Sequence, residues 1–199
     1  MNPRVTTTAS FLALFLFTAS SASCGMKTPE IKRNPHPKQR YEFTLTIQDA
    51  PGPFESVTSS ALYETDQDCI PVQALSGATP QLTEHIRIPL TPTGPNSYRG
   101  EFYADILIDQ DYFGLGVCRW SFQSVGIAMK AGDVTFGSGM SALQLAANSS
   151  SYTEYFAKTA YGKTDIPDRV ATPLPTNYIA SRRAEDFFST VLTVREQSE

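Results

Sequence analysis

Three aspartates lie close together in the chain and have the chemistry to bind a cation. Asp105, Asp109 and Asp111 carry carboxylates, whose oxygens are ligands that Ca²⁺ prefers. An EF-hand loop beginning at Asp109 would need an oxygen ligand at Phe113 and an acid at Trp120, so that motif is excluded. Two interpretations stay open. The aspartates form a calcium site of another kind, or they accept hydrogen bonds from backbone amides in turns.

Tyr112 and Phe113 follow these aspartates and are candidate partner-binding residues. Exposed aromatic side chains with a polar rim are typical of the anchors of protein–protein interfaces. Aromatic residues more often belong to the core of a domain, and that interpretation also stays open. The segment therefore predicts either a binding loop or a set of structural turns.

Cys24 is a candidate for covalent lipidation. It follows the apolar run 11–17 and the small residues 19–23. A short apolar segment followed by small residues is typical of an export signal and not of a folded domain. The position of Cys24 resembles the bacterial lipobox, although Ser21 stands where that motif prefers Leu. We expect residues 1–23 to be removed and Cys24 to be acylated; an ordinary signal peptide with an unmodified Cys24 is the alternative.

A lipidated Cys24 would place the protein outside the cytoplasm, attached to a membrane. The apolar run is far shorter than the roughly 20 residues that a membrane-spanning helix needs. Acyl chains would supply the membrane affinity instead, at about 0.8 kcal/mol for each buried methylene. Lipoproteins with Asp after the acylated cysteine stay in the inner membrane, whereas this chain has Gly25. The sequence therefore predicts the periplasmic face of the outer membrane of a Gram-negative cell.

The other two cysteines, Cys69 and Cys118, are predicted to form a disulfide. An exported protein folds in a compartment that permits disulfides, and the pair accounts for the remaining cysteines. The bond would close a loop of 48 residues, for which chain entropy gives a stabilisation of roughly 4 kcal/mol. Two buried free thiols are the alternative.

Charge divides the remaining chain into two parts of opposite sign. Residues 24–40 form a proline-rich tether with a net charge of +4, and residues 41–199 form a single domain with a net charge of −9. A tether of this composition cannot pack and is expected to be extended. Nucleic acid is excluded as a partner, because no positive charge is concentrated on the domain.

Apolar and polar residues alternate with period two along most of the domain, which predicts β-strands. We expect strands at 41–47, 57–63, 86–90, 98–108, 117–129 and 187–194. Proline- and glycine-rich turns separate them at 50–53 and 92–96, and the alternation changes face near Ser124, which indicates a bulge. Segments 140–147 and 153–161 are compatible with helix, and 165–177 with a long loop.

These elements predict a mainly β protein, an antiparallel β-sandwich with a short helical and loop insertion near the C-terminus. Cys118, Trp120 and Phe122 alternate onto one face of their strand. If that face points inward, both the disulfide and the sole tryptophan belong to the core.

The segment 109–120, together with the export signal, the turn at 50–53 and Cys69, resembles a group of small lipoproteins from Gram-negative bacteria of the Xanthomonas–Stenotrophomonas kind. Their function is uncharacterised. Some lipoproteins of this general sort are similar to periplasmic immunity proteins, which neutralise toxins delivered by contact-dependent secretion. This resemblance implies a protein-binding role and transfers no functional residue.

We predict an outer-membrane-anchored periplasmic lipoprotein that binds a protein partner, with the immunity protein as its specific form. The alternative is a structural lipoprotein of the cell envelope that binds calcium or glycan. Neither function is catalytic. The chain has only two histidines, His36 and His85, and no serine in a nucleophile elbow, so we expect no enzyme and no cofactor other than calcium.

Overall fold

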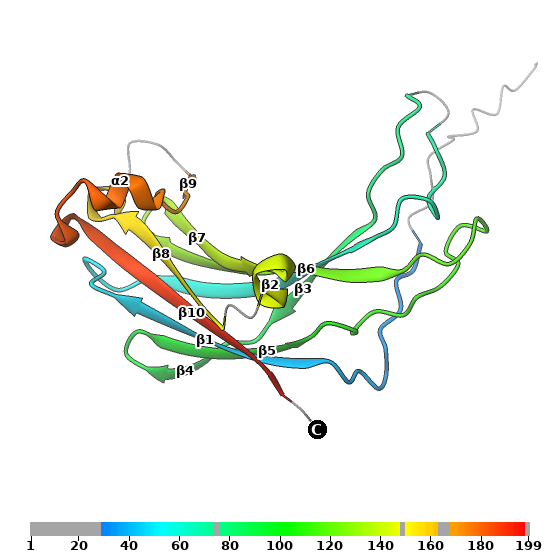
Figure 1. Ribbon diagram of the computed structural model, residues 1–199, viewed down its shortest axis with the longest axis horizontal. Helices are drawn as coiled ribbons and strands as arrows, with labels where there is room; N and C mark the ends of the chain where they lie inside the picture. Colours follow the sequence, from blue (N-terminus) through cyan, green and yellow to red (C-terminus); the bar gives the residue numbers. More distant parts are fainter. Residues whose placement is uncertain (1–28, 74–75, 148–149, 163–167, 198–199) are drawn as a thin grey trace, which may run out of the picture.

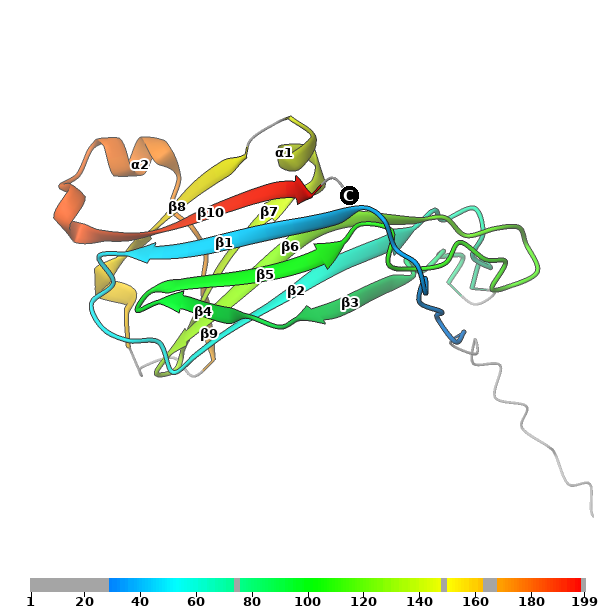
Figure 2. The same cartoon turned by 90° about the horizontal axis from the view of Figure 1, so that it is seen from below.

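The alternating segments form two β-sheets that pack face to face. The computed structural model describes residues 29–73, 76–147, 150–162 and 168–197. The first sheet has the strand order β4 (Thr91–Gly94), β5 (Ser97–Tyr103), β1 (Arg40–Gln48), β10 (Phe187–Gln197), β8 (Ser151–Ala157). The second has the order β3 (Thr83–Ile88), β2 (Ser56–Thr65), β6 (Trp120–Ala131), β7 (Val134–Ser141), β9 (Arg169–Ala171). The predicted β-sandwich is therefore confirmed (Figures 1 and 2).

Side chains from the inner faces of both sheets meet in one apolar core. On β6, Val125, Ile127 and Met129 are buried and alternate with residues that face outward. Phe136 of the second sheet contacts Phe188 of the first, with ring centroids 5.1 Å apart in an edge-to-face arrangement. Burial of each such large side chain contributes about 1.5–3 kcal/mol, so contacts between the sheets supply most of the stability of the fold.

The structure confirms most of the predicted strands and the bulge. Leu62 of β2 lies opposite Ser124 of β6, whereas the next residue, Tyr63, lies opposite Phe122. One extra residue, Gln123, is thus accommodated beside Ser124, where the alternation changes face. Neighbouring strands are antiparallel except for β7 and β9, which are parallel.

The sequence pattern does not predict strands in segments that contain glycine or that alternate only weakly between apolar and polar residues. Segment 153–161, predicted to be helical, is mostly strand β8 followed by the 3₁₀ turn Lys158–Ala160, because pairing with β10 outweighs local propensity. Strand β7 contains Gly137 and Gly139 and was not predicted. The expected turn at 92–96 includes most of β4.

The structure has two short helices: one is shorter than the predicted helical segment, and the other lies partly in a segment predicted to be a loop. Helix α1 (Ala142–Ala146) covers only part of 140–147 and begins at Ser141, which forms a capping box with Gln144. The expected loop 165–177 contains β9 and the start of helix α2 (Thr176–Ala180); residues 165–167 lie outside the described part. No helix in the described residues is long and apolar enough to cross a membrane.

The predicted tether is wrong in its boundary, because much of it packs on the domain. Arg33 forms a β-bridge with Leu107, and Asn34 donates a backbone hydrogen bond to Ile106 at 2.7 Å. The backbone amides of Lys38 and Gln39 donate to the carboxylate of Asp105. Backbone pairing satisfies polar groups that proline-rich composition alone would leave to water.

A polar cluster joins the two sheets at the side where β7 approaches β8. The carboxylate of Glu154 accepts hydrogen bonds from the Ser138 hydroxyl and from the Gly139 amide, and the Ser138 and Thr190 hydroxyls are 2.9 Å apart. Burial raises the pKa of Glu154, and the bonds from Ser138 and Gly139 oppose that shift. Because the folded pKa exceeds the unfolded one, ionisation of Glu154 destabilises the folded state.

This cluster predicts a pH-dependent effect of Glu154→Gln. The wild-type protein loses stability as pH rises from the unfolded pKa of Glu154 through its folded pKa, and the neutral amide removes that loss. The free energy of unfolding of the variant, relative to the wild type, should therefore increase from acidic to neutral pH in urea titrations. Glu30→Gln, at an exposed position, is the control. A stability difference independent of pH would contradict the assignment.

Candidate functional site

Two long loops project from the same end of the sandwich (Figures 1 and 2). One connects β2 to β3, and the other connects β5 to β6. Cys69 of the first and Cys118 of the second form a disulfide, which confirms the predicted pair. We define the double loop as residues 66–82, of which 74–75 lie outside the described residues, together with residues 109–119.

The disulfide does not lie in the sandwich core, contrary to expectation. Cys69, Cys118 and Ile70 are buried in a small cluster of their own, against which Leu82, Tyr112 and Phe113 pack. Cys118 precedes the start of β6, where Trp120 is only partly buried and packs at the edge of the main core. A strand that begins later than predicted therefore places the disulfide and the tryptophan in different clusters.

Aspartates hold the second loop in shape by accepting backbone hydrogen bonds. Asp111 Oδ1 accepts from the amides of Phe113, Gly114 and Leu115, at 3.3, 2.6 and 3.2 Å. Asp109 Oδ1 accepts from the amide of Trp120 at 2.8 Å. Gly114 adopts a left-handed φ of 77°, which favours glycine and allows the tight turn.

The three aspartates are not brought together as a calcium site. The carboxylate of Asp105 accepts from the amides of Lys38 and Gln39, whereas that of Asp111 accepts from the amides of the turn at 113–115. Among the residues that the structure describes, no group of three or more His, Cys, Asp or Glu side chains could hold a metal ion. The three carboxylates therefore do not form one cluster, and calcium binding stays a prediction. Turn capping accounts for Asp111, whereas Asp105 and Asp109 accept hydrogen bonds from amides that are more distant in the chain.

Tyr112 and Phe113 support the loop from within and are not its exposed anchors. The Tyr112 hydroxyl donates to the Ile108 carbonyl at 2.7 Å and accepts from Trp120 Nε1 at 3.3 Å. Phe113 packs with Tyr112 on the disulfide cluster. Both side chains are half-buried, so a partner would contact them only in part.

Smaller apolar residues occupy the exposed positions of the double loop. Val72, Leu115 and Val117 are 60, 56 and 48% exposed. Val72 lies on the first loop, three residues after Cys69, and the other two lie on the turn that leads to Cys118. Sequence reasoning missed them because aliphatic residues beside a cysteine are typical of a buried strand. Only their position beyond the end of the sandwich makes them accessible.

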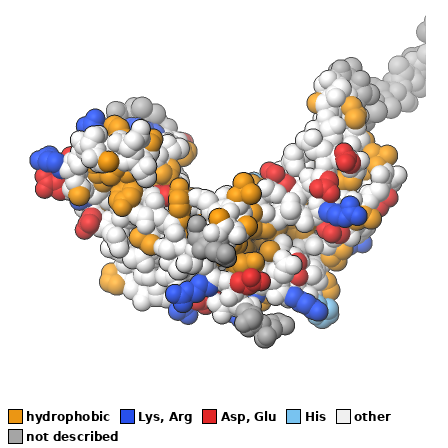
Figure 3. Space-filling view, in the orientation of Figure 1, with side chains coloured by type: hydrophobic (Ala, Val, Ile, Leu, Met, Phe, Trp, Pro, Cys, Tyr) orange, Lys and Arg blue, Asp and Glu red, His pale blue; other side chains and the backbone are white. Residues whose placement is uncertain are grey.

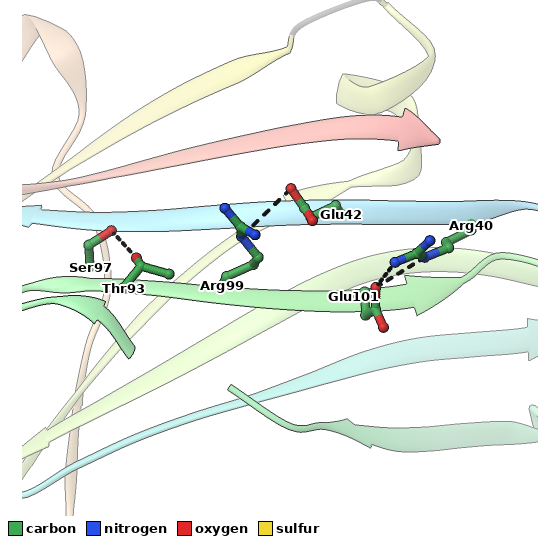
Figure 4. A network of polar contacts seen from close by, with 6 residues as sticks. All are labelled: Arg40, Glu42, Thr93, Ser97, Arg99 and Glu101. Atoms are coloured by element: carbon green, nitrogen blue, oxygen red, sulfur yellow. Dashed lines mark hydrogen bonds and ion pairs between the residues drawn. The ribbon is translucent and has the colours of Figure 1, made fainter. Parts of the chain in front are cut away.

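The double loop is acidic. Its described residues include Asp66, Asp68, Asp109 and Asp111 but only one basic residue, Arg119. By contrast, the outer face of the first sheet carries neutralised pairs, Arg40 with Glu101 and Arg99 with Glu42 at 3.7 Å (Figure 4). An excess of one charge sign around exposed apolar residues favours a partner of the opposite sign.

No family model, no curated protein and no solved structure matches the chain. The resemblance to small lipoproteins therefore stays a prediction, as does lipidation of Cys24, which lies outside the described residues.

Replacement of both disulfide cysteines by serine tests how the double loop is held. The loop closed by the bond has a sequence separation of 49, for which chain entropy gives a loss of about 4 kcal/mol in the free energy of unfolding. Urea unfolding under oxidising conditions measures this loss. Addition of a dithiol reductant should lower the stability of the wild type but leave the Cys69→Ser/Cys118→Ser variant unchanged. A wild type that is indifferent to reductant would contradict the disulfide.

Proposed function

We propose that the protein is a lipid-anchored periplasmic binding protein whose double loop binds a basic protein partner. The observation that carries the proposal is the exposure of Val72, Leu115 and Val117 on two acidic loops that a disulfide joins. Exposed apolar residues within a charged rim are the usual composition of a protein-binding surface. The proposal assigns no catalysis to the chain.

The crosslink and hydrogen bonds of the double loop support binding by a preorganised surface. The disulfide, the amide bonds to Asp111 and the half-buried Tyr112 hydroxyl bond restrain the described residues of the double loop before a partner arrives. Less conformational entropy is then lost on association, which increases affinity. A rigid acidic surface that blocks a basic site would suit an immunity protein, which inhibits a toxin by covering it.

The position of the double loop relative to the proposed lipid anchor restricts where a partner would bind. Pro29, the first described residue, belongs to the segment that leaves the domain at the end that carries the double loop (Figure 2). Four residues, 25–28, separate it from Cys24, so five Cα–Cα steps span at most about 18 Å even when extended. A lipidated Cys24 would therefore hold the double loop near the membrane surface. A partner would meet it there.

Leu115→Ser combined with Val117→Ser should weaken partner binding without unfolding the protein. Both side chains are largely exposed, so stability should change by less than about 1 kcal/mol, whereas loss of two interface anchors should reduce affinity about tenfold or more. Affinity capture from a periplasmic extract, followed by mass spectrometry and calorimetry, measures the effect.

Leu143→Ser is the matched control, because Leu143 is 83% exposed on α1 and lies outside the double loop. One stoichiometric basic partner should remain with the wild type and with this control and be lost from the double variant. Equal capture by all three proteins would contradict the role of the double loop. Absence of any partner would favour the structural envelope lipoprotein instead.

Cys24→Ser tests the anchor separately. Without the thiol no thioether-linked lipid can form, so the variant should move from the membrane fraction to the soluble fraction of the cell. Cys69→Ser/Cys118→Ser keeps Cys24 and should remain in the membrane fraction. The proposal of a lipid anchor fails if wild type and Cys24→Ser partition alike.

A further inference from the structure

A cleft of about 620 Å³ opens between the two sheets beside helix α1. Tyr41 of β1, Phe122 of β6 and Val194 of β10 contribute its apolar surface, and Leu145 of α1 covers one side. Figure 3 shows hydrophobic side chains in a hollow near the middle of this face, with acidic and basic side chains at its rim. The volume is in the range of clefts that bind small organic molecules.

An aromatic stack gives the cleft a fixed shape. The ring of Phe102 is stacked with Tyr41, with centroids 5.3 Å apart, and also with Phe122, with centroids 4.7 Å apart. Tyr63 packs edge-on against Phe122 at 5.9 Å. Each ring that lines the cleft is therefore supported by a buried aromatic neighbour. Rings held in this way can accept a ligand with little reorganisation.

Glu196 supplies a negative charge to the lining of this cleft. It lies opposite Tyr41 in the register of β1 and β10, and the alternation of β10 places it on the same face as the buried Val194. Arg195 is on the opposite face and reaches the rim. Burial first, and the nearby Glu196 carboxylate second, raise the pKa of Tyr41.

Unlike the glutamates on the outer face of the sheet, Glu196 has no cationic partner. Glu42 and Glu101 pair with Arg99 and Arg40 (Figure 4). Across the described ranges, no lysine or arginine forms an ion pair with Glu196. An exposed carboxylate beside tyrosine and phenylalanine rings has the composition of a site for organic cations, because aromatic rings also attract positive charge.

We propose that this cleft binds a small amphiphilic cation, an alkyl or aryl group that carries an ammonium or guanidinium. Glu196 is the charge partner, and Tyr41 and Phe122 contact the apolar part of the ligand. The site is separate from the double loop and would bind its ligand whether or not the double loop binds a protein.

Titration of the full chain carrying Cys24→Ser with three probes of equal length tests the site. Hexylammonium, hexanol and hexanoate differ in charge but share the alkyl chain, so calorimetry separates the charge preference from burial of the chain. We expect hexylammonium to bind with one-to-one stoichiometry and at least about fivefold more tightly than either other probe, with NMR shift changes at Tyr41 and Phe122.

Glu196→Gln keeps the shape of the side chain and removes its charge. It should weaken hexylammonium binding about fivefold and leave hexanol binding unchanged. Glu101→Gln, on the outer face of β5 in the same sheet, should change neither. Equal binding of hexanoate, an unchanged affinity in Glu196→Gln, or no binding of hexylammonium at millimolar concentration would overturn the proposal.

Discussion

Packing of the two inner sheet faces against each other is the constraint on which the rest of the structure depends. Each sheet has an apolar face that is stable only when the other sheet covers it. This packing also restricts which residue type fits at single positions. A Cβ on Gly100 would lie 2.5 Å from the ring of Phe43 on the neighbouring strand and 3.1 Å from Ile88 of the other sheet, so only glycine leaves room for these inner side chains. Loops and helices are attached to this framework, and none of them contributes a comparable core.

The double loop lies outside that framework and is stabilised by other means. Backbone amides bind Asp109 and Asp111, and the disulfide joins segments that share only a small apolar cluster. A crosslink takes the place of a core where too few apolar residues are available. Apolar side chains beyond this cluster therefore remain exposed, and these are the residues available to a partner.

The two proposed surfaces use the acidic character of the domain differently. On the double loop, four exposed aspartates share the two loops with exposed aliphatic residues, which suits a broad basic protein surface. In the cleft, the single carboxylate of Glu196 is set beside aromatic rings, which suits one small cation. Segment 31–40, which carries basic residues, pairs with residues 104–108, next to the double loop but outside it.

Period-two alternation, proline and glycine turns and cysteine parity by themselves determined the sandwich class, the bulge beside Ser124 and the disulfide, because alternation and turns are local patterns and the two remaining cysteines allow only one pair. Tertiary structure decided the rest. Strand β8 exists because β10 offers it backbone partners, and the segment from Ile31 packs because residues 104–108 pair with it. Asp105 accepts hydrogen bonds from the amides of Lys38 and Gln39, and Glu196 faces a cleft, because folding brings together residues that are distant in the chain, which no local pattern encodes.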